Sequence, residues 1–186
     1  MPGLFFVKIM DNNWEDIFRF DDQLTEEERM IRDNVREYCN KSLMPRILDA
    51  NRNEIFHPEI YKEMGELGIL GASIQGYGCA GVGYVSYGLI TREIEKIDSS
   101  YRSAFSVQSS LAMYAIYQFG SEAQKDELLP QMAKGDLIGC FGLTEPDAGS
   151  DPGSMLSAAK KVDGGYNLNG SKTWITNAPV ADVFII

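Results

Sequence analysis

The sequence predicts an α+β protein in which an N-terminal bundle of helices is followed by a β domain. Residues 22–134 carry amphipathic patterns of helical period, with capping residues at their starts. After residue 135 the pattern changes to short apolar or alternating runs, which are typical of strands. We therefore place a domain boundary there, with residues 1–135 forming the helical domain and residues 136–186 an incomplete β domain.

The first long helix is predicted over residues 22–44. Thr25 and Glu28 form a capping box at its start. Pro45 is expected to end this helix or to begin the next turn, since the residue before a proline avoids the helical conformation. Pro58 is expected to open a second helix at its first position.

Two further helices are predicted over residues 82–98 and 103–119. Ser121 and Gln124 form another capping box at the start of the last helical stretch. Pro130 is expected to divide that stretch into two short helices, because proline lacks the backbone N–H that a helix interior needs.

Short strands are expected at residues 137–143, 166–169, 172–176 and 183–186. The last run has the pattern of a buried strand, and no turn or polar tail follows it. An unpaired apolar edge invites aggregation, so we expect this chain to be the first part of a longer protein.

Composition and charge exclude several classes of protein. Of 186 residues, 44% are hydrophobic and 24% are charged, as in ordinary globular proteins, and the formal net charge is −10. Such a surface repels phosphate backbones, so no nucleic-acid partner is expected. The three cysteines and one histidine have no metal-ligand spacing, so no metal site is expected. We also expect no membrane span and recognise no leader sequence at the N-terminus.

A glycine-rich segment at residues 76–81 reads G-x-G-x-x-G. This pattern binds the phosphates of a dinucleotide when it follows a strand and opens a helix. Here helical patterns surround it and no convincing second strand follows. We therefore interpret it as a loop between helices.

The segment Phe-Gly-Leu-Thr-Glu-Pro-Asp-Ala-Gly-Ser-Asp (141–151) is a candidate binding loop. Pro146 favours a turn, and Gly149 allows backbone that a side chain would forbid. Exposed N–H groups together with the hydroxyls of Thr144 and Ser150 would suit an anionic or polar ligand. A solvated turn is an equally good interpretation of the spacing.

The segment Lys-Thr-Trp-Ile-Thr-Asn (172–177) is a second candidate. In a strand, Trp174 and Thr176 would point to the same face and could flank a planar ring. Taken alone, the pattern favours a core position for Trp174.

Together, residues 141–151 and 169–177 closely resemble the acyl-CoA dehydrogenase family. The resemblance covers about residues 14–186, roughly the first half of a family member, so that the C-terminal helical domain is expected to be absent. The segments that are most similar to the glutaryl-CoA branch of the family are residues 43–48, 50–54, 76–82, 101–104 and 106–111.

The resemblance implies a helical bundle followed by the start of a β-barrel-like middle domain, with FAD bound between that domain and the C-terminal bundle. By the match, Thr144 would lie near the pyrimidine ring of the flavin, and Gly149 and Ser150 near the pyrophosphate. Trp174 would stand beside the isoalloxazine, with Thr176 near N5. The implied FAD-binding residues are Phe141, Gly142, Leu143, Thr144, Gly149, Ser150, Trp174, Ile175 and Thr176.

The resemblance also implies a substrate site. Arg102 would bind the free carboxylate of glutaryl-CoA, with Ser103 beside it, and Ser150 would approach the acyl-CoA. An arginine fork suits a carboxylate geometrically. The alternative for Arg102 is a surface ion pair with Asp98. No catalytic residue is expected in this chain, because the family's base lies in the C-terminal domain, and Glu145 is expected to be a scaffold of the loop.

The implied activity is FAD-dependent oxidative decarboxylation of glutaryl-CoA to crotonyl-CoA and CO2, in lysine and tryptophan degradation. This chain is expected to be inactive alone. A non-catalytic binding module derived from the family, and a short-chain acyl-CoA dehydrogenase without decarboxylation, are the alternatives. Electron-transfer flavoprotein is the expected acceptor, and the full-length parent is expected to be a homotetramer. The compartment would be the cytoplasm in a bacterium or the mitochondrial matrix in a eukaryote.

Overall fold

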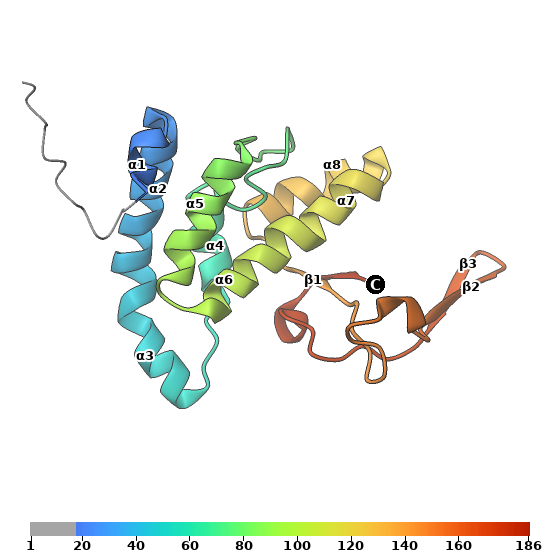
Figure 1. Ribbon diagram of the computed structural model, residues 1–186. Helices are drawn as coiled ribbons and strands as arrows, with labels where there is room; N and C mark the ends of the chain where they lie inside the picture. Colours follow the sequence, from blue (N-terminus) through green and yellow to red (C-terminus); the bar gives the residue numbers. More distant parts are fainter. Residues whose placement is uncertain (1–17) are drawn as a thin grey trace, which may run out of the picture.

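The computed structural model describes residues 18–186, which form a helical body and a smaller segment with strands (Figure 1). The predicted α+β class is confirmed, and the described strands form no closed barrel. Our prediction about a leader falls on residues 1–17, outside the described part. Between residues 18 and 186, no helix combines the length and the apolar character needed to cross a bilayer.

The helical body contains α-helices that are interrupted by two π-helical stretches, η2 and η3. In chain order these elements are α1 (Phe20–Gln23), α2 (Glu26–Tyr38), η2 (Cys39–Leu43), α3 (Met44–Asn53), α4 (Glu59–Glu66), α5 (Tyr84–Glu95), α6 (Ser99–Ser106), η3 (Val107–Met113), α7 (Tyr114–Phe119) and α8 (Glu122–Ala133).

The two predicted capping boxes are confirmed. At the start of α2, the hydroxyl of Thr25 accepts from the N–H of Glu28 at 3.2 Å, and the Glu28 carboxylate accepts from the N–H of Thr25 at 2.8 Å. Ser121 and Gln124 make the same reciprocal pair before α8. Each pair satisfies N–H groups that a helix start would otherwise leave without partners.

The predictions about prolines are confirmed in part. Of the two expectations for Pro45, the second is confirmed, since this residue lies in the first turn of α3, directly after the π-helical stretch. The division of the last helix at Pro130 is wrong, because α8 runs unbroken through that residue. Leu129 and Met132 on α8 are fully buried, and this packing outweighs the one hydrogen bond that the proline removes. Pro58 is the N-cap residue of α4, one position before the first helical position that we predicted for it.

The helix predicted over 103–119 begins earlier, at α6. The carboxylate of Asp98 accepts from the N–H of Ser100 at 2.7 Å and so caps α6 at this earlier point. The glycine-rich segment 76–81 is a loop between helices, as we interpreted it.

A buried carboxylate joins α2 to α5. Glu93 is 2% exposed, and Arg36 donates to its two oxygens at 3.0 and 3.2 Å. Lys96 donates to the same carboxylate at 3.0 and 3.2 Å. Burial would raise the pKa of Glu93, but these hydrogen bonds lower it below its ordinary value. The paired charge lets α5 place Ile90 and Ile94 in the core beside it.

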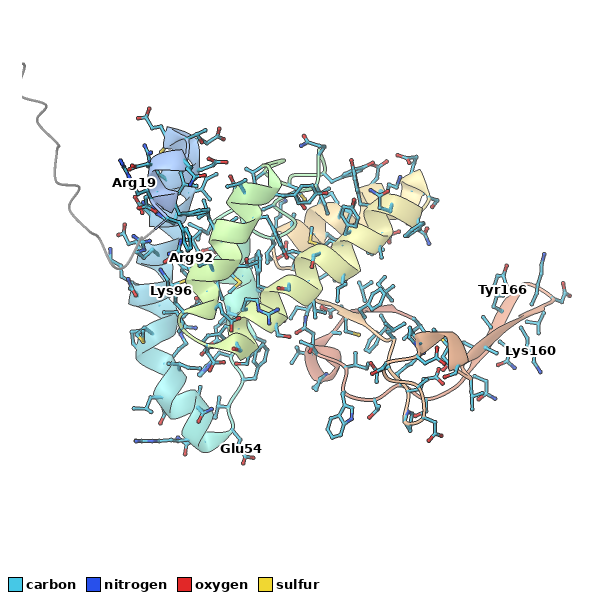
Figure 2. The ribbon with its side chains drawn as sticks, in the orientation of Figure 1. Arg19, Glu54, Arg92, Lys96, Lys160 and Tyr166 are labelled. Atoms are coloured by element: carbon cyan, nitrogen blue, oxygen red, sulfur yellow. The ribbon has the colours of Figure 1, made fainter. Side chains whose placement is uncertain are left out.

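The strands form two small sheets. Strand β1 (Gly139–Phe141) pairs in parallel with β4 (Val183–Ile185), and β2 (Ala158–Val162) pairs antiparallel with β3 (Gly165–Asn169). The β2–β3 hairpin extends away from the helices, as the positions of Lys160 and Tyr166 in Figure 2 show. Two short 3-10 helices, η4 (Pro152–Ser154) and η5 (Ala178–Val180), complete the segment.

Two expectations about strands differ from the structure. Residues 172–176 form no strand, because the backbone turns at Trp174, whose φ is 57°. Residues 183–186 do contain a strand, β4, but it is not buried on both sides, since Phe184 is 54% exposed. Val183 and Ile185, on the other side, pack against the helical core.

Close packing of α4 against the end of α8 depends on a glycine. Gly135 follows α8 with a φ of 70°, and a Cβ built on it would lie 2.1 Å from the carbonyl oxygen of Tyr61. Gly68, after α4, has a similar φ of 74°, but a Cβ there would meet nothing within 4 Å. The two glycines share a backbone conformation and differ in their surroundings.

We predict that Gly135→Ala lowers the free energy of unfolding by about 2–4 kcal/mol, since backbone strain and a steric clash add. The matched variant Gly68→Ala has only the strain and should lose about 1 kcal/mol. Urea denaturation followed by circular dichroism measures both. Equal losses would show that the approach of Gly135 to α4 contributes nothing.

Candidate functional site

The two candidate segments, 141–151 and 172–177, lie side by side. The N–H of Thr173 donates to the carbonyl oxygen of Thr144 at 2.9 Å. Lys172 Nζ donates to the carbonyl oxygen of Leu143, also at 2.9 Å. Segments almost thirty residues apart in sequence thus form one surface.

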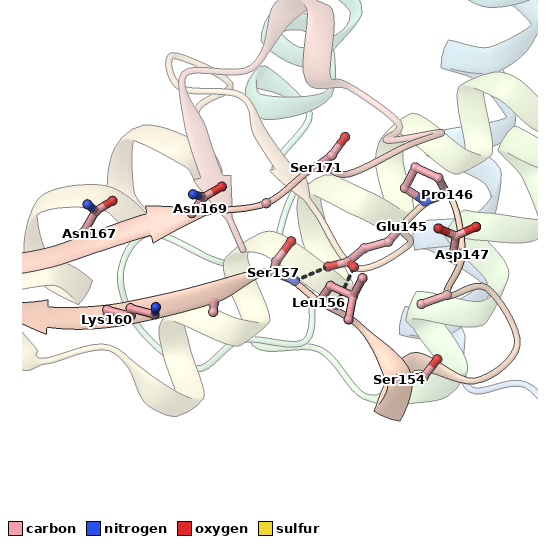
Figure 3. Close-up of a pocket in the computed structure, with 13 residues that line it drawn as sticks. Glu145, Pro146, Asp147, Ser154, Leu156, Ser157, Lys160, Asn167, Asn169 and Ser171 are labelled. Atoms are coloured by element: carbon pink, nitrogen blue, oxygen red, sulfur yellow. Dashed lines mark hydrogen bonds between the residues drawn. The ribbon is translucent and has the colours of Figure 1, made fainter.

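Glu145 holds this surface together from within. Its side chain is buried, and Lys172 Nζ donates to Oε1 at 2.8 Å. The N–H groups of Leu156 and Ser157 donate to the two carboxylate oxygens at 2.6 and 3.0 Å, as the dashed lines in Figure 3 show. Because these donors occupy the carboxylate, Glu145 is a scaffold of the loop, as the sequence led us to expect.

The electrostatics of Glu145 follow from these contacts. The hydrogen bond from Lys172, together with those from Ser157 and Leu156, lowers the pKa of the Glu145 carboxyl from 4.5 to about 2. Lys172 is 11% exposed and Glu145 6%, so bulk water screens this pair little.

A cavity of about 710 Å³ lies between the Glu145 loop and the β2–β3 hairpin (Figure 3). Its walls combine hydroxyl, amide and charged side chains with apolar ones. Its lining residues are Glu145, Pro146, Asp147, Ala148, Ser154, Leu156, Ser157, Ala158, Lys160, Asn167, Asn169, Gly170 and Ser171.

Trp174 lies neither in a strand nor in the core, and both expectations are wrong. Its side chain is 92% exposed, because the left-handed turn at this residue leaves the indole outside the packed interior. Isolated exposed apolar side chains are common. An indole that is exposed between two half-buried neighbours, Thr173 and Ile175, is nevertheless a candidate contact for a ligand.

A second cavity, of about 360 Å³, lies between α6 and η5 and has mainly apolar walls. Ser103 contributes from α6, and Thr176 contributes from the turn before η5. The residue expected at the substrate and the residue expected near the flavin therefore line one cavity. The other lining residues are Phe56, Ser100, Ala104, Asn177, Pro179 and Val180.

Arg102 is not among the residues that line this cavity. Its Nε donates to a carboxylate oxygen of Glu95 at 2.7 Å. The alternative of an ion pair with Asp98 is wrong, because the Asp98 carboxylate caps α6. Hydrogen bonds from Ser99 and Arg102 lower the pKa of Glu95. Arg102 thus lies one residue before Ser103 with its charge paired at the surface.

The remaining predicted residues lie along the loop after β1. Gly142 donates its N–H to the carbonyl oxygen of Ile185 at 2.7 Å, and a Cβ on it would lie 2.8 Å from the side chain of Ile186. Gly149 and Ser150 are exposed. A Cβ on Gly149 would meet nothing within 4 Å, so the predicted need for glycine there is not found. Phe141 is half-buried at the end of β1.

The roles of two amide side chains near the cavity were not predicted from the sequence. Asn177 and Gln108 are buried and bind the backbone of β1 at Gly139. Asparagine tolerates left-handed backbone, and Asn177 has a φ of 72°, so its place before a proline-containing turn was a usable signal. Nothing in the local sequence pattern distinguishes Gln108. Within residues 18–186, no cluster of His, Cys, Asp or Glu could hold a metal ion.

Known protein families and characterised relatives match almost the whole of the described chain. The N-terminal domain of acyl-CoA dehydrogenases matches residues 25–136, and the middle domain matches residues 140–186. The chain is 39% identical over 163 residues to an acyl-CoA dehydrogenase of Bacillus subtilis, which covers 87% of this chain and 43% of the relative. It is 38% identical over 167 residues to the mitochondrial isovaleryl-CoA dehydrogenase of Pongo abelii, and this match covers 88% of this chain and 39% of the relative. The chain therefore belongs to the acyl-CoA dehydrogenase family.

Solved structures agree with this family. A glutaryl-CoA dehydrogenase from Mycobacterium smegmatis in complex with FADH2 superposes with a TM-score of 0.89 at 48% identity, covering 90% of this chain and 44% of that one. A structure of the electron transferring flavoprotein of Acidaminococcus fermentans matches with a TM-score of 0.82 at 37% identity, covering 87% and 43%. The chain spans less than half the length of the relatives it matches.

We predict that Glu145 makes stability depend on pH at the acidic end. A carboxyl with a lowered folded-state pKa stabilises the fold above its unfolded value of 4.5, and this contribution is lost as the pH falls towards about 2. The urea midpoint should therefore fall more steeply between pH 5 and pH 2 in the parent chain than in Glu145→Gln. Glu122→Gln is the control. Lys125 also lowers the pKa of the Glu122 carboxyl, but this carboxylate is exposed, so its loss should change the slope much less than Glu145→Gln does. Identical slopes for the parent and Glu145→Gln would contradict the prediction.

Proposed function

We propose that this chain supplies the helical domain and the first part of the middle domain of an FAD-dependent acyl-CoA dehydrogenase, most specifically a glutaryl-CoA dehydrogenase. One observation carries the proposal: Ser103, expected at the substrate, and Thr176, expected at the flavin, line the same cavity. The domain boundary is proposed near residue 135.

The residues of the second segment fit a flavin. An exposed indole at Trp174 offers an apolar face for a planar ring, and the nearby hydroxyls of Thr144 and Thr176 can pair with its polar edge. The exposed backbone and hydroxyl at Gly149 and Ser150 suit a pyrophosphate. When bound, FAD would supply the hydride acceptor for oxidation of the acyl chain. The proposed FAD-binding residues remain Phe141, Gly142, Leu143, Thr144, Gly149, Ser150, Trp174, Ile175 and Thr176.

The mainly apolar walls of the second cavity suit a short acyl chain. At its edge, Ser103 would orient a polar end of the substrate, and Arg102 would leave Glu95 to bind a terminal carboxylate. The M. smegmatis neighbour at 48% identity supports the glutaryl substrate, whereas the isovaleryl-CoA relative at 38% supports only the family reaction. Ser150 is proposed to approach the acyl-CoA.

The proposed reaction is the oxidative decarboxylation of glutaryl-CoA to crotonyl-CoA and CO2, with electron-transfer flavoprotein as the acceptor and a homotetramer as the full-length assembly. This chain would contribute binding and orientation rather than the catalytic base, since its buried carboxylate at the site, Glu145, is fully occupied by donors. A short-chain acyl-CoA dehydrogenase without decarboxylation, or a non-catalytic module, is the alternative.

The flavin assignment is tested in a chimera that continues residue 186 with the corresponding C-terminal part of the M. smegmatis enzyme. We predict that Trp174→Ala weakens FAD binding about tenfold, because the ring loses an aromatic contact. Phe119→Ala removes another highly exposed aromatic residue, on α7, and should leave FAD binding unchanged. The measurement is equilibrium titration of the deflavinated chimera with FAD. Equal affinities in all three proteins would exclude Trp174 from the flavin site.

The substrate assignment is tested in the same chimera with Arg102→Met. A carboxylate that leaves water needs a charged hydrogen-bonding partner, so kcat/KM for glutaryl-CoA should fall about 30- to several-thousand-fold, corresponding to about 2–5 kcal/mol. Butyryl-CoA has no terminal carboxylate, so its kcat/KM should change little. If both constants fall equally, Arg102 is structural and the short-chain alternative holds. A parent chimera that binds FAD but oxidises neither substrate would favour the non-catalytic module.

A further inference from the structure

Asn177 is one of the residues that line the cavity between α6 and η5. This side chain is 7% exposed, and its residue adopts left-handed backbone with a φ of 72°. Its Nδ2 donates to the carbonyl oxygen of Gly139 in β1 at 3.0 Å and, in a longer contact of 3.4 Å, to the carbonyl oxygen of Ala104 in α6. One amide group therefore contacts both the strand and the helix.

The same glycine is held from the other side by Gln108. The N–H of Gly139 donates to Gln108 Oε1 at 2.7 Å, and Gln108 Nε2 donates to the carbonyl oxygens of Met132 and Leu137 at 3.1 and 2.9 Å. Both backbone polar groups of Gly139 are thus bound by side-chain amides. A Cβ at Gly139 would lie 2.5 Å from Cβ of Ala112, so β1 has no room to shift towards η3.

The contacts of Asn177 join the two sides of the cavity. Ala104 follows Ser103 on α6, and Asn177 follows Thr176 in the turn. Within residues 18–186, the Asn177 amide makes the one hydrogen bond between residues 174–180 and α6. Apart from the two hydrogen bonds of the Asn177 amide, this turn has two internal ones. The N–H of Ala178 donates to the carbonyl oxygen of Ile175, and the N–H of Val180 donates to that of Asn177.

We propose that Asn177 is a positioning residue: its amide, anchored on Gly139, fixes the distance between Thr176 and the helix that carries Ser103. The inference deepens the proposed function and rests on it, since Thr176 and Ser103 are the residues expected at the flavin and the acyl chain. Both hydrogen bonds of the Asn177 amide go to backbone carbonyl oxygens, so this role requires no hydrogen bond from Asn177 to either ligand. It acts by keeping the width of the cavity constant.

A test of this proposal must distinguish the effect of the left-handed backbone at Asn177 from the effect of its side-chain amide. Asn177→Gly keeps a residue that adopts the positive φ at no cost and removes only the amide. Glu54→Gly is the matched control, because Glu54 has a φ of 54° at the end of α3 and is not among the residues that line the cavity. Asn177→Asp keeps the shape but replaces the donor with a carboxylate that faces two carbonyl oxygens.

The measurement is amide hydrogen exchange of the full 186-residue chain, without any cofactor or acyl-CoA. In Asn177→Gly, protection factors at Ala178 and Val180 should fall about tenfold or more, as expected when a buried hydrogen bond is lost. Amides of α2 and α5 should change less than about threefold, and Glu54→Gly should leave the turn unchanged. No ligand is present in this experiment, so its outcome does not depend on the flavin and substrate tests. Likewise, a negative result here would not affect the outcome of those tests.

The aspartate variant gives a readout that a merely structural residue would not produce. At neutral pH its carboxylate repels the two carbonyl oxygens, and the turn should lose protection. When acid protonates the introduced carboxyl, its O–H can donate to Gly139, and protection at Ala178 and Val180 should return towards that of the parent at the same pH. Unchanged protection in Asn177→Gly overturns the proposal. An equal loss across α2, α5 and the turn, without recovery in acid, would also overturn it.

Discussion

The backbone of Gly139 is the point on which the arrangement of the two parts of the molecule depends. Both of its polar groups are bound by side-chain amides, one from Gln108 on the helical body and one from Asn177 on the segment with strands. A buried backbone group without a partner is costly, so the two amides stabilise the contact between β1 and η3. The lack of a Cβ at Gly139 permits that contact.

The position of the candidate site follows from these contacts of Gly139. Strand β1 leads directly into the loop that Glu145 and Lys172 hold, and the same loop pairs with the segment that exposes Trp174. On the other side, α6 brings Ser103 to the cavity that Thr176 lines. A small number of buried polar contacts thus places residues from three separate stretches of sequence around one region. The surface outside these contacts is left for ligands.

Local signals in the sequence predicted the helical body better than the site. Capping boxes such as Thr25 with Glu28 are made by residues three apart, so the sequence alone predicts them. Pro130 and Trp174 were mispredicted because tertiary packing and a single left-handed residue override local preference. The family motifs supplied the candidate residues of the proposed site. The ion pair of Arg102 with Glu95 and the bridge made by Asn177 depend on three-dimensional contacts that no local pattern contains.

The most direct test of how these parts form a site is a crystal structure of the chimera with FAD and a non-reactive glutaryl-CoA analogue. We expect the isoalloxazine beside Trp174, the hydroxyl of Thr176 within hydrogen-bonding distance of it, and the terminal carboxylate of the analogue on Arg102. The acyl chain should occupy the cavity between α6 and η5. A flavin bound away from Trp174 and Thr176, or an acyl chain outside that cavity, would contradict the site described for this chain.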